Sequence, residues 1–260
     1  MKNASRLIIL LAVAALCADG CVSLPPVNAP VARVQPPQPA QTDWEPVETG
    51  MDRRVYASST LQAAMTVYRL DPAHFDFRFE TATTTQTMAQ WSSEFPDAAL
   101  IVNGVYFHED NLPSGYLSSH GTAVGIRRFD LDKSGLIALD DGVHIYDTSV
   151  NPPRFDSFAD AAQSYPLFFK SGKPAIKEDS QKPARRSFIG KDARGNVYIG
   201  VVPSAQISLY QTMLMLGETG IEWANVINLD GGPSTGITTK AESVPSLFPV
   251  PNVIAVFRKP

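Results

Sequence analysis

Alternating apolar and polar residues predict strands over most of the chain beyond about residue 50. "MTVYRL" (65–70) and "FDFRFE" (75–80) alternate on either side of the turn "DPAH", which predicts a pair of strands. "AALIVNGVYF" (98–107) is an apolar run typical of a buried strand, and Asn103-Gly104 interrupts it. Further strands are expected at 123–128, 135–139, 143–146, 166–169, 186–191, 196–202, 225–229 and 253–257.

Two segments have the spacing of helices instead. "TMAQWSSEF" (87–95) follows threonines that can cap a helix, and "SLYQTMLMLGETG" (208–220) repeats apolar residues at helical intervals and ends at a glycine. Many strands and few helices predict the α+β class, with a mixed, largely antiparallel sheet and a few packed helices.

The first 21 residues follow a different pattern. Lys2 and Arg6 precede a short apolar run that cannot span a bilayer, which is typical of an export signal. The "ADGC" that ends at Cys21 resembles the lipobox of bacterial lipoproteins. This resemblance implies an exported, periplasmic or cell-envelope protein that is anchored to the membrane through lipidated Cys21. The alternative is an ordinary signal that is cleaved near Ala18.

A proline-rich segment separates this signal from the domain. Residues 22–50 hold seven of the 21 prolines and no periodic apolar pattern, so we expect a semi-extended tether. The folded domain is then predicted to span residues 51–260.

Composition excludes several classes of function. The net charge is -4 and no run of Lys or Arg is present, which argues against nucleic acid as a partner. Both cysteines, Cys17 and Cys21, lie in the signal segment, so the domain has neither an internal disulfide nor a cysteine zinc site. No cofactor is evident from the sequence, and a divalent cation remains open.

Three strand-ending segments carry the candidate chemistry: "IVNGVYFHED", "RRSFIGKDARGNVYIGVV" and "VINLDGGPSTG". Glycines at a strand end let backbone N–H groups approach an anionic ligand. Asp230 follows the apolar run "VINL", where burial can tune the pKa of a carboxylate. The same Asp-Gly-Gly is also typical of an ordinary hairpin turn.

The other two segments each leave alternatives open. Asn103 and Tyr106 are placed to orient a polyhydroxylated ligand. The "HED" at 108–110 is a weak metal motif, because neighbouring residues on an extended chain point to opposite faces, and a solvated loop is the alternative. Of Arg185 and Arg186, one is expected to offer a bidentate fork to phosphate or carboxylate, and the other can be a surface residue.

Residues 232–236 also fit the G-x-S-x-G pattern of a serine nucleophile elbow. That motif needs a following helix and a later histidine, but no histidine follows Ser234 and prolines occupy the next segment. A triad in another chain order remains geometrically open.

Together the segments resemble the phosphodiester glycosidase family. "NGVYF" (103–107), "RSFIGKDARG" (186–195) and "NLDGGPST" (228–235) follow the family's order of motifs, and "YPLFFKSGK" (165–173) matches an intervening strand. The resemblance covers about residues 60–258. Two positions depart from the pattern, because Val105 and Pro233 replace glycines, and Pro233 removes one backbone N–H from the expected anion cradle.

The resemblance implies a hydrolase that releases a sugar from a sugar-1-phosphodiester or a related phosphorylated glycan. Asp230 is then the acid, base or nucleophile, with Glu109 or Asp110 as a second carboxylate if one is needed. The alternative is a surface-tethered, non-catalytic module that binds anionic glycan. The implied catalytic residues are Asp230, Arg186 and Asn103, and the implied substrate-binding residues are Asn228, Gly231, Gly232, Ser234, Thr235 and Tyr106.

Overall fold

The computed structural model describes residues 43–125, 129–150 and 152–260. The chain divides into two units, Met1–Pro36 and Pro37–Pro260, and every described residue belongs to the second. The predicted export signal, Cys21 and most of the predicted tether therefore lie outside the described residues, as do positions 126–128 of one predicted strand. No helix in the described part of the chain is long and apolar enough to cross a membrane.

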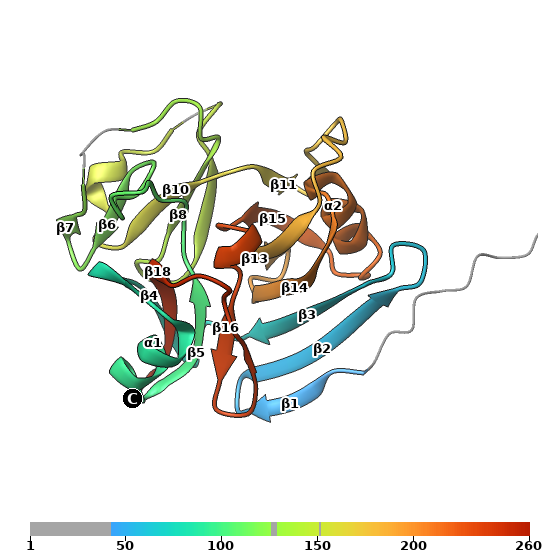
Figure 1. Ribbon diagram of the computed structural model, residues 1–260, viewed down its shortest axis with the longest axis horizontal. Coiled ribbons are helices and arrows are strands. Elements are labelled where there is room, and N and C mark those ends of the chain that lie inside the picture. The colour runs from blue at the N-terminus through green and yellow to red at the C-terminus, as the bar shows by residue number, and fades with distance from the viewer. Residues whose placement is uncertain (1–42, 126–128, 151) are drawn as a thin grey trace, which may run out of the picture. The chain divides into compact units, whose positions relative to one another are not determined.

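The largest sheet has eight strands and one covering helix (Figure 1). The helix α2 (Leu209–Gly217) is capped by Ser208 and packs its apolar side against this sheet. The strands of this eight-stranded sheet, in spatial order, are β1 (Glu45–Glu48), β2 (Met51–Ser58), β3 (Ala63–Leu70), β14 (Val197–Ile207), β13 (Ala184–Asp192), β15 (Trp223–Asn228), β11 (Leu167–Lys170) and β12 (Lys173–Pro174). The sheet thus begins at Glu45, inside the segment that the sequence assigns to the tether.

Two five-stranded sheets complete the described unit. The helix α1 (Met88–Glu94), capped by Thr87, packs on the first of them. That sheet is ordered β17 (Ser243–Val244), β16 (Ile237–Thr239), β5 (Ala98–Asn103), β18 (Val250–Arg258) and β4 (Phe75–Gln86). The other is ordered β7 (Thr122–Ala123), β6 (Leu117–Ser119), β10 (Ala161–Ser164), β8 (Gly135–Ala138) and β9 (His144–Asp147). Two 3-10 turns, η1 (Phe155–Ser157) and η2 (Gly232–Ser234), are also present.

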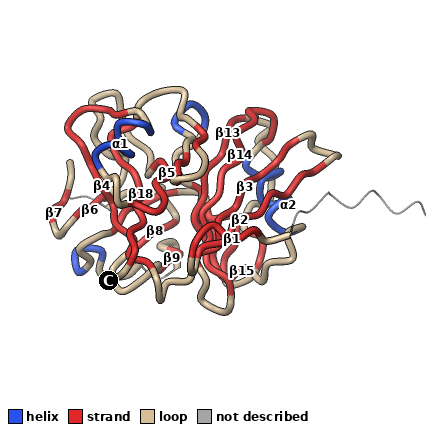
Figure 2. The backbone as a smooth tube through the Cα atoms, turned by 90° about the horizontal axis from the view of Figure 1, so that it is seen from below, coloured by secondary structure: helices blue, strands red, loops and turns tan. Residues whose placement is uncertain are grey.

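Strands dominate the described chain, as Figure 2 shows. Every strand pair in the described ranges is antiparallel, so the fold is mostly β with two short α-helices. The largely antiparallel sheet and both helices predicted from the sequence are therefore confirmed, and the mixed sheet is not, because no parallel pair occurs among these strands.

The predicted pairing of 65–70 with 75–80 is wrong, although both strands exist. Strand β3 pairs with β2 and β14, whereas β4 pairs with β18 at the edge of a different sheet. The turn at Asp71–His74 therefore carries the chain from one sheet to another. The alternation of apolar and polar residues predicts a strand and its buried face, but it does not determine which other strand pairs with it.

One apolar core joins the three sheets. Ile189 and Ile227 come from the large sheet, Leu100 and Ile254 from the sheet of β5, and Ile137 from the sheet of β8, and all are buried in a single cluster. This shared core brings the ends of β5, β13 and β15 together. These three strand ends carry the three motifs.

Candidate active site

Asp230 lies two residues beyond the end of β15, in a position fixed by its backbone. Its N–H donates to the carbonyl of Gly104 at 2.9 Å. Its carboxylate accepts from the Gly231 N–H at 2.9 Å and from the Ser234 hydroxyl. Burial raises the pKa of Asp230 to about 6, although these two hydrogen bonds act in the opposite direction. The carboxyl therefore changes charge within the physiological pH range.

Asn103, at the end of β5, is a buried connector of the three motifs. Its Nδ2 donates to the Asp230 carbonyl at 2.7 Å and, more weakly, to the Gly104 carbonyl at 3.4 Å. Its Oδ1 accepts from the Ser187 hydroxyl at 2.6 Å and from the Gly236 N–H at 3.1 Å. Since the amide is fully hydrogen-bonded within the protein, Asn103 positions Asp230 and leaves no group free for a ligand.

Asn228 and Tyr106 form the second polar group of the site. The Nδ2 of Asn228 donates to the Tyr106 hydroxyl at 2.5 Å and to the Tyr165 carbonyl at 3.1 Å. A carbonyl only accepts, so this contact fixes the orientation of the amide. The buried Oδ1 of Asn228 is left without a hydrogen-bond partner. An acceptor of this kind suits a sugar hydroxyl.

The two tyrosines give the site an aromatic wall. The rings of Tyr106 and Tyr165 lie 4.8 Å apart at an angle of 32°, and Tyr165 is 39% exposed. Burial and the nearby Asp230 carboxylate raise the pKa of Tyr106, so its hydroxyl stays protonated. Aromatic faces with a fixed hydroxyl are well suited to contact a sugar ring.

Arg186, near the start of β13, is a buried cation beside the same turn. It is 7% exposed, and no described carboxylate forms an ion pair with it. Its Nη2 donates to the Lys182 carbonyl at 2.7 Å, and its Nε has no partner. Burial lowers the pKa of Arg186. An unpaired buried guanidinium is costly for the fold and is therefore a good receptor for an anion.

Arg185 is equally buried, so neither arginine is the surface residue that the sequence allowed. Successive residues of a strand point to opposite faces, and the contacts of the two side chains differ accordingly. The Nη2 of Arg185 donates to the carbonyl of Pro245 at 2.9 Å. The Nη1 of Arg186 lies beside the glycine turn instead, 3.5 Å from the position that a Cβ on Gly231 would occupy. The backbone carbonyl of Arg185 also approaches this position, at 3.0 Å, but of the two side chains it is that of Arg186 that lies beside the turn after Asp230.

The glycine turn itself is the 3-10 element η2. Gly232 has φ +60°, a left-handed conformation that favours glycine, and open space surrounds the position of its absent Cβ. Ser234 and Thr235 are 6% and 0% exposed, and the Thr235 hydroxyl has no hydrogen-bond partner. The strand β16 follows, so no helix accompanies Ser234 as a nucleophile elbow requires.

Both departures from the family pattern are accommodated. Val105 is 2% exposed, packs in the shared core, and pairs its backbone with the side chain of Asn252. Pro233 occupies the first turn of η2, where a backbone N–H needs no partner within the helix. The hydrogen bonds that hold Asp230 come from other residues, so neither departure removes one of them.

Gly104, unlike the glycines that Val105 and Pro233 replace, has no room for a side chain. A Cβ on this residue would lie 2.0 Å from the Oδ1 of Asn252 and 3.0 Å from its carbonyl oxygen. The N–H of Gly104 donates to the same carbonyl at 3.0 Å, and its own carbonyl holds Asp230. Glycine is therefore required by the close approach of β18 to the first motif.

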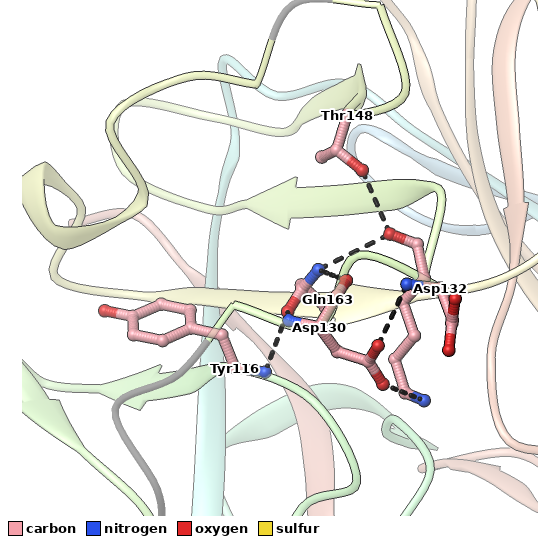
Figure 3. Close-up of polar contacts among 6 residues, drawn as sticks. Tyr116, Asp130, Asp132, Thr148 and Gln163 are labelled. Carbon is pink, nitrogen blue, oxygen red and sulfur yellow. Dashed lines mark hydrogen bonds and ion pairs between the residues drawn. The ribbon is translucent and has the colours of Figure 1, made fainter.

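His108, Glu109 and Asp110 lie in an exposed loop beyond Tyr106. His108 and Asp110 line a separate cavity of about 710 Å³, and residues 129–132 form another part of its wall. Figure 3 shows how Gln163 holds this wall, since its amide accepts from the backbone N–H groups of Tyr116 and Asp130 and donates to the Asp130 carbonyl. In the described residues no group of three or more His, Cys, Asp or Glu side chains could hold a metal ion.

The structure thus brings Asp230, Asn228, Arg186, Tyr106 and the glycine turn together, and it leaves Glu109 and Asp110 in the exposed loop. Sequence reasoning missed several residues that support the site. Ser187 bonds Asn103, Ser164 donates to the Asn228 carbonyl at 2.6 Å, and Asn252 holds Val105. A polar residue within an apolar strand, as in "NVIAV" at 252–256, is the only signal that marks Asn252 in advance.

The site therefore combines a titratable carboxyl, a guanidinium without an ion pair to a described carboxylate, and an unpartnered amide acceptor beside two aromatic rings. The sequence pattern of the phosphodiester glycosidase family matches residues 96–257. The chain belongs to this family.

Solved structures share the fold at low sequence identity. The catalytic domain of zebrafish N-acetylglucosamine-1-phosphodiester alpha-N-acetylglucosaminidase, auto-inhibited by its pro-peptide, matches with a TM-score of 0.61 and 13% identity over 87% of this chain and 85% of that one. A hypothetical protein from Synechocystis matches with a TM-score of 0.59 and 18% identity over 81% of this chain. The match spans 62% of the Synechocystis chain. No curated protein sequence matches.

Proposed function

We propose that the protein is an exported hydrolase that releases a sugar from a sugar-1-phosphodiester. The proposal rests on Asp230, whose pKa burial raises to about 6, and on the buried Arg186, whose guanidinium lies beside the turn that follows Asp230 and forms no ion pair with a described carboxylate. Membership of the phosphodiester glycosidase family favours hydrolysis over the alternative, a non-catalytic module that binds anionic glycan.

We assign each residue a role from its contacts. Arg186 binds the phosphate, and the free Oδ1 of Asn228 accepts a hydrogen bond from a sugar hydroxyl. The bond between the anomeric carbon and the phosphate oxygen breaks, and the phosphate monoester leaves with the bonding electrons, stabilised by Arg186. Water supplies the hydroxyl group of the new hemiacetal. The second proton of this water molecule is transferred to the carboxylate of Asp230 and then to solvent.

One carboxylate is enough for this reaction. Glycosidases generally use a second carboxyl to protonate the leaving oxygen. A phosphate monoester is already a weak base, so protonation contributes little to its departure. The ionised Asp230 then acts as the base toward water or as the nucleophile, and Asn103 and the Ser234 hydroxyl hold it in place.

The pH profile tests this role of Asp230. Because the ionised carboxylate is the active form, kcat/KM is expected to rise about tenfold per pH unit below pH 6 and to level off above it. The measurement is initial rates of free-sugar release from a panel of synthetic sugar phosphodiesters between pH 4 and 8. A profile that falls above pH 6 would instead make Asp230 a general acid, and no release from any member of the panel would refute the proposed hydrolysis.

A further inference from the structure

An exposed apolar surface lies beside the proposed catalytic turn. It consists of Pro233 and the segment "PSLFP" at 245–249, which contains no charged residue. Leu247 and Phe248 are 67% and 64% exposed, and the prolines at 233, 245 and 249 are exposed as well. Single exposed apolar side chains need no explanation, but a contiguous group of this kind marks a binding surface. We call these residues the apolar lip.

Hydrogen bonds fix the apolar lip to the turn. The N–H groups of Leu247 and Phe248 both donate to the carbonyl of Pro233, at 2.7 and 3.1 Å. On the other side, Arg185 holds the carbonyl of Pro245. A Cβ on Gly236 would lie 2.8 Å from the N atom of Ser246, so the loop packs directly on the chain that follows the turn. The two large side chains are therefore exposed on an anchored loop.

The order of groups along the turn indicates what the apolar lip contacts. Asp230 is followed by Gly231, beside the guanidinium of Arg186, then by Gly232 with open space around it, and then by exposed Pro233. A phosphodiester with its sugar at Asp230 and its phosphate at Arg186 has one remaining substituent, the aglycone. Space for that substituent exists at Gly232, and the next residue, Pro233, is hydrogen-bonded to the backbone of Leu247 and Phe248, so we expect the substituent to lie beside these two side chains.

We propose that the substrate is a sugar phosphodiester with an apolar aglycone, such as an alkyl or isoprenoid chain, which packs on Leu247 and Phe248. This inference rests on the proposed function, since it takes the sugar and the phosphate to lie as described above. A polar aglycone would gain nothing from an uncharged surface, whereas each methylene group buried there contributes favourably to binding.

The first test measures binding without turnover, by nuclear magnetic resonance titration of the intact protein with methyl phosphate and with hexyl phosphate. The wild type is expected to bind hexyl phosphate at least tenfold more tightly, because burial of about two methylene groups is sufficient for that ratio. The double substitution Leu247→Ser, Phe248→Ser is expected to abolish the preference and to leave the affinity for methyl phosphate within about twofold. Leu214→Ser is the matched control, because Leu214 is 43% exposed on α2, outside the apolar lip, and should keep the preference.

The second test measures hydrolysis of the methyl and hexyl diesters of a sugar 1-phosphate. Hydrolysis of both at equal kcat/KM, or equal binding of the two phosphates by the wild type, would overturn the apolar aglycone and leave the proposed function intact. A hexyl preference in binding with no hydrolysis of either diester would refute the proposed function and preserve the binding surface. Binding to phosphatidylcholine vesicles that depends on Leu247 and Phe248, without a hexyl preference, would assign the surface to a membrane and overturn the proposal.

Discussion

Replacement of Asp230 by asparagine is expected to lower the release of free sugar from a sugar phosphodiester by about 10²- to 10⁴-fold. Asparagine keeps the size of the side chain and can still accept from the Gly231 N–H, but it can neither take a proton from water nor attack the anomeric carbon. The loss is expected in kcat, because Arg186 and Asn228 still bind the substrate.

The same substitution separates catalysis from folding. Burial raises the pKa of Asp230 from 3.8 to about 6, so the folded state holds this proton more tightly than the unfolded state. Stability therefore falls as pH rises from about 4 to 6, and at pH 7 the ionised group destabilises the fold by up to about 3 kcal/mol. The Asp230→Asn variant lacks this penalty, and its free energy of unfolding at pH 7 should be equal to that of the wild type or higher.

Chemical denaturation and initial rates check both parts. Asp156→Asn removes a carboxylate whose side chain is 61% exposed and serves as the control, with activity and stability close to wild type. Full activity in Asp230→Asn would remove Asp230 from the mechanism. A large loss of stability in that variant would show that the carboxylate is needed for the fold.

Replacement of Arg186 by methionine is the second large effect that we expect, with kcat/KM reduced by about 10²- to 10³-fold. The guanidinium is the cation in contact with the glycine turn, and its Nε is unpartnered. Methionine fills a similar volume without charge, so the leaving phosphate loses its stabilising cation. Lysine restores a point charge without the bidentate fork and should recover activity only in part.

Stability again distinguishes a role in binding from a role in folding. Arg186 forms no ion pair with a described carboxylate, so its replacement by methionine leaves no buried carboxylate without a partner. The free energy of unfolding should therefore not fall by more than about 1 kcal/mol. Arg185→Met is the matched variant on the same strand, since Arg185 is equally buried but holds Pro245. We expect it to change kcat/KM by less than about tenfold. Equal losses in both variants would contradict a specific contact between Arg186 and phosphate.

Two of the strands that lead into the site, β5 and β15, were predictable because each is a mainly apolar run that ends at an asparagine, whereas β13 has only a short apolar centre between charged residues. β13 and β15 lie within two residues of their predicted bounds, and β5 begins as predicted at Ala98 but ends at Asn103 rather than at residue 107. The short strands β6, β12, β16 and β17 were not predicted, because two or three residues are too few to show a period. The partners of β3 and β4 could not be inferred, since they depend on chain segments far away in the sequence.

The proximity of the predicted site residues could be inferred from the sequence better than their contacts. Asp230, Arg186 and Asn228 lie close together as expected, but the side chain of Asn103 makes four hydrogen bonds within the protein, three of them to the other two motif segments. Two of its partners, Ser187 and Gly236, lie 84 and 133 residues away along the chain, and no local pattern specifies such contacts. The fit of Pro233 could not be predicted from the sequence either, because it depends on the exposed position of this residue in the first turn of η2.

The central claim is that water attacks the sugar and that the bond from the anomeric carbon to oxygen breaks. Hydrolysis of a sugar phosphodiester in H₂¹⁸O, followed by mass spectrometry of both products, tests it most directly. The site geometry, with Asp230 serving the anomeric carbon and Arg186 the leaving phosphate, predicts the label in the released sugar and none in the phosphate monoester. Label in the phosphate monoester would mean attack at phosphorus and would contradict the proposed function.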